Sequence, residues 1–497
     1  MMLAISGRNR VAPEREFCLT IEACIPKEDL KGQSVAIIGL GKSGIAAAKL
    51  ALARGASVLA LDQNETLKPL EKNLLNAKYG HLKTILGRFD HELFDEADLI
   101  VVSPGVPLEN YCLASLFQSG KHVMSELDFA AEVLPRSTKV LAVTGTNGKS
   151  SVATFAGQML SHSNIRTFVG GNLGIPLSEA ALECLSSPQR PFQAAVVEVS
   201  SYQLEIPNKY FFPSVAVILN LTPDHLERHK SMRNYSTIKC RVFSHMSGRK
   251  MAILPMGNPY ITDAIACHAN ECMSAWIGAY PGIKVDMEKK VANFNVPGIG
   301  LLSQMPLDSM KAIGTHNYYN ASVAALSVIG LDLGIDIAAI SSTIDKLRAP
   351  PHRMQIVHED RCGVTWVDDS KATNVEATYA GLMGLKEKKS VVLLGGLSKV
   401  LDAQGSNGFE QLIEPLKYHQ GVVTFGSSGM LIHDTLSSYG LSIPCRRAKD
   451  LKDAVRLAKT MAKPGDAILL SPACASFDEF KNFEHRGKFF QELALST

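Results

Sequence analysis

The stretch VLAVTGTNGKSSV, residues 140–152, decides the fold of the middle of the chain. Its first residues are apolar and partly β-branched, which is typical of a buried parallel strand, and its last residues begin a segment of good helix formers. The glycine-rich turn between them points backbone N–H groups toward a helix N-terminus, where a polyphosphate is favoured. A chance glycine turn is the alternative, but the strand–turn–helix context favours a nucleotide-binding loop.

In such a loop Lys149 reaches the terminal phosphates and the Ser150 hydroxyl contacts Mg2+. The spacing departs from the usual G-x-x-x-x-G-K-[ST], because Val143 occupies the first glycine position. We expect the whole loop to bind ATP: Gly145, Thr146, Asn147, Gly148, Lys149, Ser150 and Ser151.

Short apolar strands alternate with helical segments on both sides of this loop, which predicts mostly parallel sheets. The predicted fold class is α/β with three tandem domains: Rossmann-like, then a P-loop ATPase-type sheet, then Rossmann-like again. Consecutive prolines after Arg348 suit a linker. The predicted divisions are an extension at 1–30, a first domain at 31–128, a central domain at 129–348 and a last domain at 349–497.

Composition excludes several classes of protein. The chain has 497 residues, of which 46% are hydrophobic and 20% charged, as in ordinary globular proteins. A net charge of +3 is too balanced for a nucleic-acid coat or a polybasic membrane anchor, and no apolar run is long enough to span a bilayer. The ten cysteines show no paired CxxC spacing, which argues against a disulfide framework or a zinc site. We expect a cytoplasmic monomer; a plastid stroma is the alternative if the arginine-containing N-terminus is a targeting remnant.

A second glycine turn, GLGKSG at residues 39–44, follows another strand and opens a helix. With Asp62 at the end of the next strand it fits a dinucleotide fingerprint, although the same geometry serves any diphosphate. The residues alone therefore leave an NAD(P)-dependent oxidoreductase open.

Polar residues follow two further strands, and ligands collect at the carboxyl ends of parallel strands. Glu198 ends one strand, where it holds a cation or forms a salt bridge, and Asp224 and His225 follow the next. His225 is a metal-ligand candidate, with a simple hydrogen-bonding role as the alternative. Spacing alone predicts Lys239 to be a solvated helix lysine.

The last domain has two polar turns after strands, DDSKATN at 368–374 and SPACASFD at 471–478, which suit a polar ligand. Cys474 in the second turn has no histidine convincingly placed as its base, so we expect a packed thiol and not a nucleophile.

Together these motifs resemble the Mur ligase family of ATP-dependent amide-forming enzymes over essentially all of residues 33–495. Within the family, SSYQLE and the last motif are typical of the members that add D-glutamate. The motifs are GTNGKS at 145–150, GGNLG at 170–174, EVSSYQLE at 198–205, NLTPDH at 220–225, GTHN at 314–317, PHR at 351–353, DDSKATN at 368–374 and SPACASFDEFKNFEHRG at 471–487.

The resemblance implies that D-glutamate is joined to UDP-N-acetylmuramoyl-L-alanine through an acyl phosphate, in peptidoglycan precursor synthesis, with no nucleic-acid or membrane partner. It also implies that the first glycine turn holds UDP and not NAD. A folylpolyglutamate synthase-like ligase and a non-catalytic homologue stay as alternatives.

Site roles are carried over by motif. The implied catalytic residues are Lys149, His225 and Lys239; further ATP contacts are Asn317, Arg353 and Asp369; UDP-substrate contacts are Ser43, Asp62, Gly105 and Asn172; amino-acid contacts are Lys371, Thr373, Lys399, Ser476 and Phe483; ligands of two Mg2+ ions are Ser150, Glu198, His225 and Lys239 as a carbamate.

Overall fold

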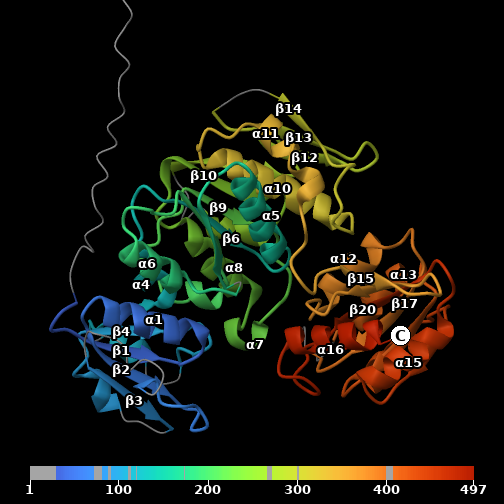
Figure 1. The fold of residues 1–497 in the computed structure, drawn as a ribbon, viewed down its shortest axis with the longest axis horizontal. Coiled ribbons are helices and arrows are strands. Elements are labelled where there is room, and N and C mark those ends of the chain that lie inside the picture. The colour runs from blue at the N-terminus through green and yellow to red at the C-terminus, as the bar shows by residue number, and fades with distance from the viewer. Residues whose placement is uncertain are drawn as a thin grey trace, which may run out of the picture.

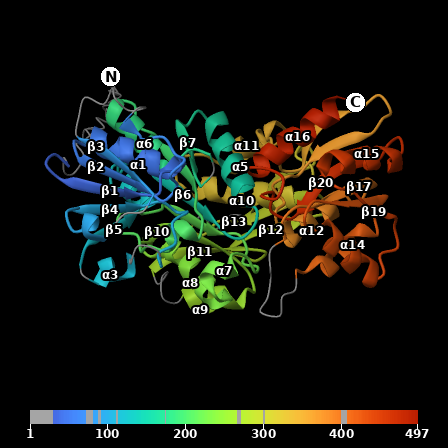
Figure 2. The same cartoon turned by 90° about the horizontal axis from the view of Figure 1, so that it is seen from below.

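The computed structural model describes residues 30–71, 81–87, 91–109, 113–118, 120–172, 174–265, 271–298, 302–398 and 407–496. Lys399, predicted to contact the amino acid, lies outside these residues, as does the predicted extension up to residue 29. The chain forms three α/β domains, each built on one sheet, which confirms the predicted fold class. Figure 1 shows them as blue, green-to-yellow and orange-to-red lobes, and Figure 2 shows the central domain between the other two.

The amino-terminal domain has a five-stranded parallel sheet in the order β3-β2-β1-β4-β5. The order reverses direction between β1 and β4, and ligands bind at such a switch point, outside the carboxyl ends of the strands. The glycine turn at 39–41 lies at this point. The elements are β1 Ser34–Ile38, α1 Lys42–Ala53, β2 Ser57–Asp62, β3 Leu82–Leu86, β4 Leu99–Val102, α3 Leu113–Gln118, β5 His122–Ser125 and α4 Glu126–Ala131.

The central domain has a nine-stranded sheet in the order β14-β13-β12-β11-β10-β9-β6-β8-β7. It is parallel from β7 to β12, and an antiparallel meander of β12, β13 and β14 completes one edge. Its strands are β6 Lys139–Thr144, β7 Thr167–Gly171, β8 Ala194–Glu198, β9 Val215–Ile218, β10 Ser247–Pro255, β11 Glu271–Ile277, β12 Gly282–Asp286, β13 Val291–Asn295 and β14 Leu302–Pro306.

The nucleotide-loop helix α5 packs beside α10 in this domain. Strands β8 and β9 are buried along their whole length, and β6 is buried after its first residue, as expected for a sheet covered on both faces. The helices are α5 Lys149–His162, α6 Leu177–Ser186, α7 Leu226–His229, α8 Met232–Cys240, α9 Pro259–Ile265, α10 His316–Gly330 and α11 Ile337–Ser341.

The carboxy-terminal domain has a six-stranded sheet in the order β15-β16-β20-β17-β18-β19, parallel except for the edge strand β15. Its elements are β15 Gln355–Glu359, β16 Thr365–Asp368, α12 Val375–Gly384, β17 Ser390–Gly395, α13 Ile413–Leu416, β18 Gly421–Phe425, α14 Gly429–Ser438, β19 Cys445–Arg447, α15 Leu451–Met461, β20 Ala467–Ala473 and α16 Phe483–Leu495.

The two junctions between domains differ in construction. One buried apolar cluster contains both Val35 of the first sheet and Ile261 of α9, so the first two domains share a core. The two clusters of the last domain contain no buried member from another domain among the described residues; Ile313 only packs at the rim of one. The predicted division at 128/129 falls within α4.

Among the described residues, no helix combines the length and the apolar character that crossing a membrane requires.

Candidate active site

The loop between β6 and α5 has the backbone that its glycines permit. Gly145 and Gly148 have φ values of +137° and +87°, in the region that favours glycine. A Cβ on Gly148 would lie 2.9 Å from the Asn320 Oδ1 atom, so the loop also needs the missing side chain there. Asn220, directly after β9, holds the loop: its carbonyl and Oδ1 accept hydrogen bonds from the N–H groups of Thr146 and Asn147, at 2.9 and 2.8 Å.

Lys149 folds back over this loop. Its Nζ donates hydrogen bonds to the carbonyl oxygens of Gly145 at 3.0 Å and Thr146 at 2.8 Å. The ammonium therefore lies over the turn where the predicted polyphosphate would bind.

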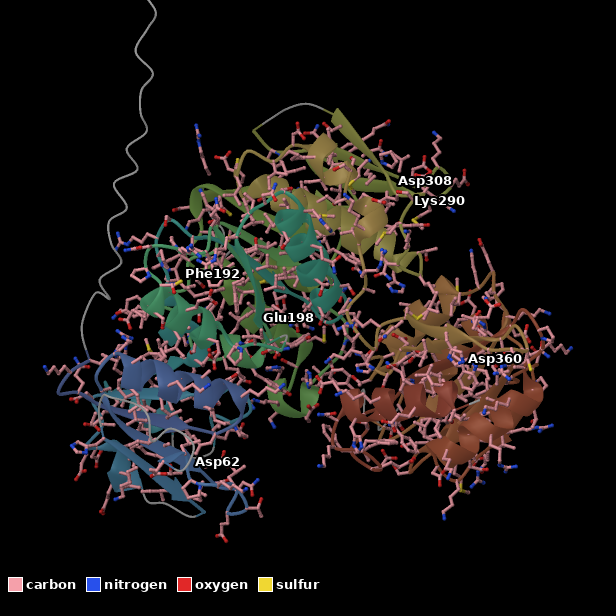
Figure 3. The ribbon with its side chains drawn as sticks, in the orientation of Figure 1. Asp62, Phe192, Glu198, Lys290, Asp308 and Asp360 are labelled. Carbon is pink, nitrogen blue, oxygen red and sulfur yellow. The ribbon has the colours of Figure 1, made fainter. Side chains whose placement is uncertain are left out.

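Glu198 ends β8 beside this lysine and is buried. Burial raises the pKa of the carboxyl, but the Lys149 ammonium and neighbouring polar groups outweigh that effect and lower it below its usual value. One carboxylate oxygen accepts a hydrogen bond from the Asn172 side chain at 2.8 Å, whereas Oε2 is buried without a hydrogen-bond partner among the described residues. Figure 3 places Glu198 near the middle of the molecule, distant from Asp62. Its ionised oxygen is suited to a cation.

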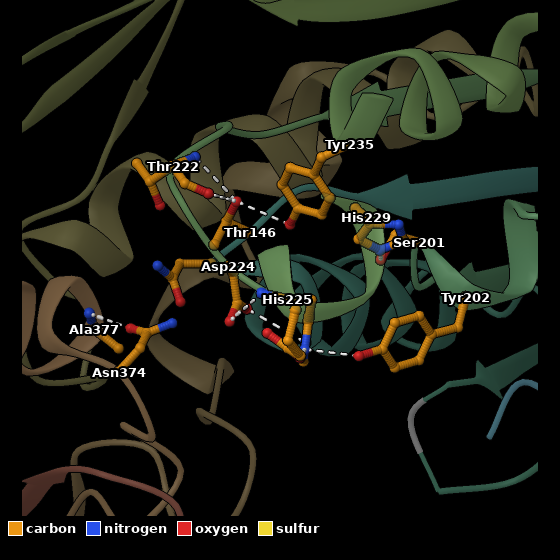
Figure 4. Close-up of polar contacts among 12 residues, drawn as sticks. Thr146, Ser201, Tyr202, Thr222, Asp224, His225, His229, Tyr235, Asn374 and Ala377 are labelled. Atoms are coloured by element: carbon orange, nitrogen blue, oxygen red, sulfur yellow. Dashed lines mark hydrogen bonds and ion pairs between the residues drawn. The ribbon is translucent and has the colours of Figure 1, made fainter. Parts of the chain in front are cut away.

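The segment after β9 carries Asp224 and His225, and it bends sharply, since His225 has a φ of +55°. His225 Nδ1 lies 2.8 Å from the Tyr202 hydroxyl, and Nε2 lies 3.4 Å from the Asp224 carboxylate (Figure 4). Tyr235 of α8 contacts the Thr146 hydroxyl at 3.1 Å in the same view. Lys149, Glu198 and Asp224 are all close enough to Lys239 to act on its charge, and His225 contacts Asp224, so these predicted residues lie together.

Lys239 is buried, with 2% of its surface exposed. The prediction from spacing of a solvated helix lysine is therefore wrong, because α8 turns this face inward beside the loop. Its Nζ donates to the Gly145 carbonyl at 3.0 Å and to the Thr144 hydroxyl at 3.3 Å. Burial and, next, the Lys149 charge lower the pKa of Lys239 well below its usual value. The lowered pKa favours the neutral amine form of Lys239.

A hollow of about 520 Å³, here called the Asp62 hollow, opens between the first two domains, and Glu484 of the last domain also lines it. Lys42 is the only cationic side chain among the described residues of its lining. Asp62 itself is held by two backbone N–H groups, those of Leu40 at 2.6 Å and Asn64 at 2.8 Å. All of the predicted UDP-substrate contacts line this hollow: Ser43, Asp62, Gly105 and Asn172.

A second hollow of about 60 Å³, the His316 hollow, lies between the nucleotide loop and the last domain. Arg353 reaches across to Ser150, with Nη2 at 3.0 Å from the hydroxyl oxygen. Asp369 accepts a hydrogen bond from Ser471 at 2.7 Å, and burial raises the pKa of Asp369 to about 7. Burial likewise lowers the pKa of His316 to about 4. The lining includes Asn147, Gly148, Ser151, His316, Asn320, Arg353 and Asp369.

A third hollow of about 590 Å³, the Lys371 hollow, lies against the last domain. The Lys371 ammonium is 3.7 Å from the centre of the Phe483 ring, and burial, with the nearby Arg353 charge, lowers the pKa of Lys371 to about 8. Ser150 and Lys42 also line this hollow, so it adjoins both the nucleotide loop and the Asp62 hollow.

Not every predicted contact reaches these walls. Thr373 and Ser476 line none of the three hollows: Thr373 lies in the turn with Lys371, and Ser476 is buried after β20. Asn317 is buried one helical turn before Asn320, whose side chain donates to it at 3.2 Å.

Sequence reasoning missed Lys42, Tyr202, Tyr235, His316 and Asn320. Helical spacing could have found two of them, since Asn320 is three residues after Asn317 and Tyr235 is four residues before Lys239, which puts each pair on one helix face. Cys474 is buried, as the expectation of a packed thiol requires. The described residues contain no group of three or more His, Cys, Asp or Glu side chains arranged to hold a metal.

Comparison with known families matches each domain in turn. Residues 33–125 match "Mur ligase MurD-like, N-terminal domain", residues 143–328 match "Mur ligase middle domain", and residues 352–474 match "Mur ligase, glutamate ligase domain".

Comparison with curated proteins finds similar chains of nearly equal length. The UDP-N-acetylmuramoylalanine--D-glutamate ligase of Anaeromyxobacter dehalogenans is 35% identical over 94% of this chain and 98% of its own. The ligase of the same name from Pseudomonas aeruginosa is 35% identical over 92% and 98%.

Solved structures share the fold at lower identity. A MurF ligase from Thermotoga maritima in complex with ADP has a TM-score of 0.57 and 19% identity, covering 95% of this chain and 98% of its own. A Mycobacterium tuberculosis folylpolyglutamate synthase has a TM-score of 0.53 and 17% identity, covering 76% and 98%.

Proposed function

The chain belongs to the Mur ligase family, and from this premise we propose that it joins D-glutamate to UDP-N-acetylmuramoyl-L-alanine at the expense of ATP. The product is a peptidoglycan precursor. The observation that carries this proposal is that the nucleotide loop adjoins the Lys371 hollow, which Ser150 lines, and that Lys42 lines both this hollow and the Asp62 hollow. Three small-molecule reactants can thus meet at one place.

The nucleotide is assigned to the loop and the His316 hollow. Lys149 would exchange its two carbonyl partners for the terminal phosphates, which are stronger acceptors because they are charged. Arg353 and Asp369 reach the same place from the last domain. At about 60 Å³ the hollow has room for only a few water molecules, so nucleotide entry requires the central and last domains to separate.

The residues at the sheet edge fit Mg2+. The unpartnered Oε2 of Glu198 and the Ser150 hydroxyl are hard oxygen donors of the kind that this ion prefers. We assign the predicted ligands Ser150, Glu198 and His225 to this role, with His225 as the alternative contact to a developing oxyanion. Bound there, Mg2+ would neutralise charge on the transferred phosphoryl group.

Lys239 fits the carbamate implied by the family resemblance. A carbamate forms when a neutral amine attacks CO2 and loses a proton, and the lowered pKa of this buried lysine supplies the neutral amine. The resulting anion would place two further oxygens beside Glu198.

The UDP part of the substrate is assigned to the Asp62 hollow. Lys42 opens α1, so its ammonium and the first backbone N–H groups of the helix both favour the diphosphate. Asn172 links this hollow to Glu198 and would approach the muramoyl end of the substrate.

D-Glutamate is assigned to the Lys371 hollow. An amino acid with two carboxylates needs cations, and Lys371 and Arg353 line this hollow together with the Phe483 ring. Thr373, Ser476 and Lys399 stay predictions for the same ligand.

The reaction needs two steps. A carboxylate in water is a poor acyl donor because its leaving group is poor, so its oxygen attacks the γ-phosphorus of ATP and an acyl phosphate forms with release of ADP. The glutamate amine then attacks the acyl carbon, and phosphate leaves. Lys149 and Arg353 stabilise charge on the phosphoryl group, and the surrounding domains exclude water from the acyl phosphate.

Two alternatives fit less well. An oxidoreductase would use the first glycine turn but leaves the nucleotide loop without a role. The folylpolyglutamate synthase structure covers 76% of this chain, against nearly full length for the D-glutamate ligases. We place the reaction in the cytoplasm; the bacterial relatives lend the plastid alternative no support, and a monomeric state stays a prediction.

The test is phosphate release that requires ATP, D-glutamate and the UDP-muramoyl acceptor together. Lys149→Ala should lower kcat about 10²- to 10³-fold, whereas Lys289→Ala, on an exposed turn, should leave it unchanged. Transfer of 18O from the acceptor carboxylate to phosphate should accompany turnover. Turnover without that transfer would exclude the acyl phosphate, and no glutamate-dependent release by the wild type would exclude the function.

A further inference from the structure

Arg228 belongs to a short helix, α7, directly after His225. Its Nε donates a hydrogen bond to Glu205 Oε1 at 2.8 Å, and one Nη atom donates to the other oxygen of the same carboxylate. The side chain is 17% exposed and that of Glu205 is 9% exposed, so the pair is largely shielded from water. This two-point contact fixes the guanidinium plane.

The same guanidinium reaches into the first domain. Nη2 donates a hydrogen bond to the Val106 carbonyl at 2.9 Å. Val106 belongs to the loop at residues 103–107, which lines the Asp62 hollow. A Cβ on Gly39 would lie 2.7 Å from Val106 Cγ2, so the loop packs directly on the glycine turn. Arg228 thus holds the wall of the substrate hollow.

In the other direction Arg228 holds Tyr202. Its guanidinium carbon lies 4.3 Å from the centre of the tyrosine ring, and the hydroxyl of that ring contacts His225 Nδ1 at 2.8 Å (Figure 4). His225 has a left-handed backbone, which a bulky residue keeps only when its surroundings hold it. The tyrosine is therefore part of what orients His225 and, through it, Asp224.

A second arginine in the domain has the same local chemistry without these two connections. Arg166 pairs with Glu183 and lies 4.7 Å from the centre of the Phe192 ring. Neither Arg166 nor its partners line any of the three hollows. An arginine that pairs with a carboxylate and an aromatic ring need not serve the site. Arg228 differs because it connects Val106, at the wall of the Asp62 hollow, with Tyr202.

We propose that Arg228 is a positioning residue that couples the Val106 wall of the Asp62 hollow, through Tyr202, to His225. Binding of the UDP substrate and orientation of the phosphate-side residues then depend on each other. The inference rests on the proposed function, since it takes the Asp62 hollow as the UDP-substrate site.

The experiment compares steady-state constants for Arg228→Gln, Arg228→Lys, Tyr202→Phe and the control Arg166→Gln, with thermal unfolding measured for each. Arg228→Gln should raise the KM of the UDP substrate about tenfold and lower kcat about tenfold, with the KM of ATP unchanged. Arg228→Lys should recover part of the loss in kcat and part of the rise in KM, because a lysine keeps the positive charge but cannot make the two-point contact of the guanidinium.

Tyr202→Phe keeps the ring but removes the hydroxyl from His225. It should lower kcat alone, and its combination with Arg228→Gln should have the kcat of Arg228→Gln, because both act through one connection. Arg166→Gln should change none of the kinetic constants.

Three outcomes would overturn the inference: a folded Arg228→Gln protein with wild-type constants, equal changes in Arg166→Gln, or multiplicative kcat losses in the double variant. If Arg228→Gln does not fold, an unchanged kcat in Tyr202→Phe overturns it. A wild-type protein without glutamate-dependent phosphate release contradicts the proposed function, and the inference with it; an active wild type with unchanged variants contradicts the inference alone.

Discussion

The junction between the first two domains and the junction between the last two are built from different interactions. At the first, an apolar cluster runs from one domain into the other, and Asp128 accepts hydrogen bonds from three backbone N–H groups, those of Lys209, Tyr210 and Phe211. A partly buried ion pair, Arg54 with Glu132, adds to it.

At the second junction the described residues share no buried apolar core, and Ile313 packs only at the rim of one cluster of the last domain. Arg353 contacts Ser150, and Gln158 exchanges two hydrogen bonds with the backbone of Arg348 in the linker. The segment before α10 and the end of α12 meet through two glycines: a Cβ on Gly384 would lie 2.9 Å from the Gly314 Cα.

The difference indicates that the first junction contributes to the stability of the folded protein, whereas the second junction changes when ligands bind. A shared apolar core makes the first two domains one cooperative unit. Arg353 and Ser150, which connect the two domains at the second junction, also line the ligand hollows, so we expect ligands themselves to complete this junction. Four predictions test this contrast, from the largest effect to the smallest.

Asp128→Ala should break the first junction. It removes the acceptor of three backbone N–H groups in a buried place, and we expect a loss of about 4 kcal/mol in the free energy of unfolding, measured in urea. Asp98→Ala is the control: Asp98 accepts one exposed N–H group, from Ser34, and its loss should cost under about 1 kcal/mol. A loss of equal size in both would contradict the contrast.

Asp369→Asn should change how the free energy of unfolding depends on pH, because Asp369 lies at the second junction. Burial raises the pKa of this carboxyl from 3.8 to about 7 in the folded protein, so its stabilising contribution is complete below pH 3.8 and is lost as the pH rises through 7. The variant lacks that loss. Its free energy of unfolding relative to wild type should rise by about 3 kcal/mol between pH 5 and pH 8.

The control for this pH effect is Asp360→Asn. Burial raises the pKa of Asp360, but hydrogen bonds from Trp366 and two backbone N–H groups outweigh it and lower the pKa below 3.8. Its stability contribution therefore changes only at lower pH. If the free energy of unfolding changed with pH in the same way for Asp369→Asn and wild type, the raised pKa of Asp369 would be refuted.

Arg353→Ala should weaken the second junction where the nucleotide completes it. The lost charge-assisted contact is worth about 1.5–3 kcal/mol, or roughly 10- to 100-fold in ADP affinity by calorimetry. The exposed Arg348 in the linker supplies the control, and Arg348→Ala should leave ADP affinity unchanged. Full ADP affinity in Arg353→Ala would show that this junction does not depend on the nucleotide.

Lys42→Met should have the smallest effect, mainly on the Asp62 hollow, although Lys42 also lines the Lys371 hollow. Removing the one described cation that lines the Asp62 hollow should raise the KM of the UDP substrate about five- to tenfold, equal to roughly 1 kcal/mol, with kcat little changed. Lys49→Met is the matched control on the same helix, since Lys49 pairs with Glu179 and lines no hollow described above. A change in kcat larger than that in KM would contradict a binding role.

Much of the fold could be predicted, because buried parallel strands are apolar runs that end in glycine turns. Helix starts were less accurate. The run of good helix formers starts at Ala46, whereas α1 begins at Lys42, because a helix that opens inside a glycine turn starts with residues that resemble the turn. The apolar run of the last strand ends at Leu470, whereas β20 continues through Pro472 to Ala473, since an extended backbone tolerates proline.

The site was predictable wherever one chain segment contains its signal, as in the nucleotide loop and Glu198. Lys239 was not, because the sequence of α8 is polar and its burial is decided by the neighbouring loop and strands. The His316 hollow could not be predicted either, since its lining residues come from two domains and no local sequence pattern shows that these domains are in contact.

The shared core of the first two domains has a consequence for synthesis. While the chain leaves the ribosome, helices α1 and α4 beside the amino-terminal sheet lack their partner α6, which begins at Leu177, about fifty residues after the last strand of that sheet. The nascent protein therefore exposes an unfinished apolar surface until α6 has been synthesised, and the carboxy-terminal domain, whose clusters are its own, is the part that can fold on release without waiting for the rest.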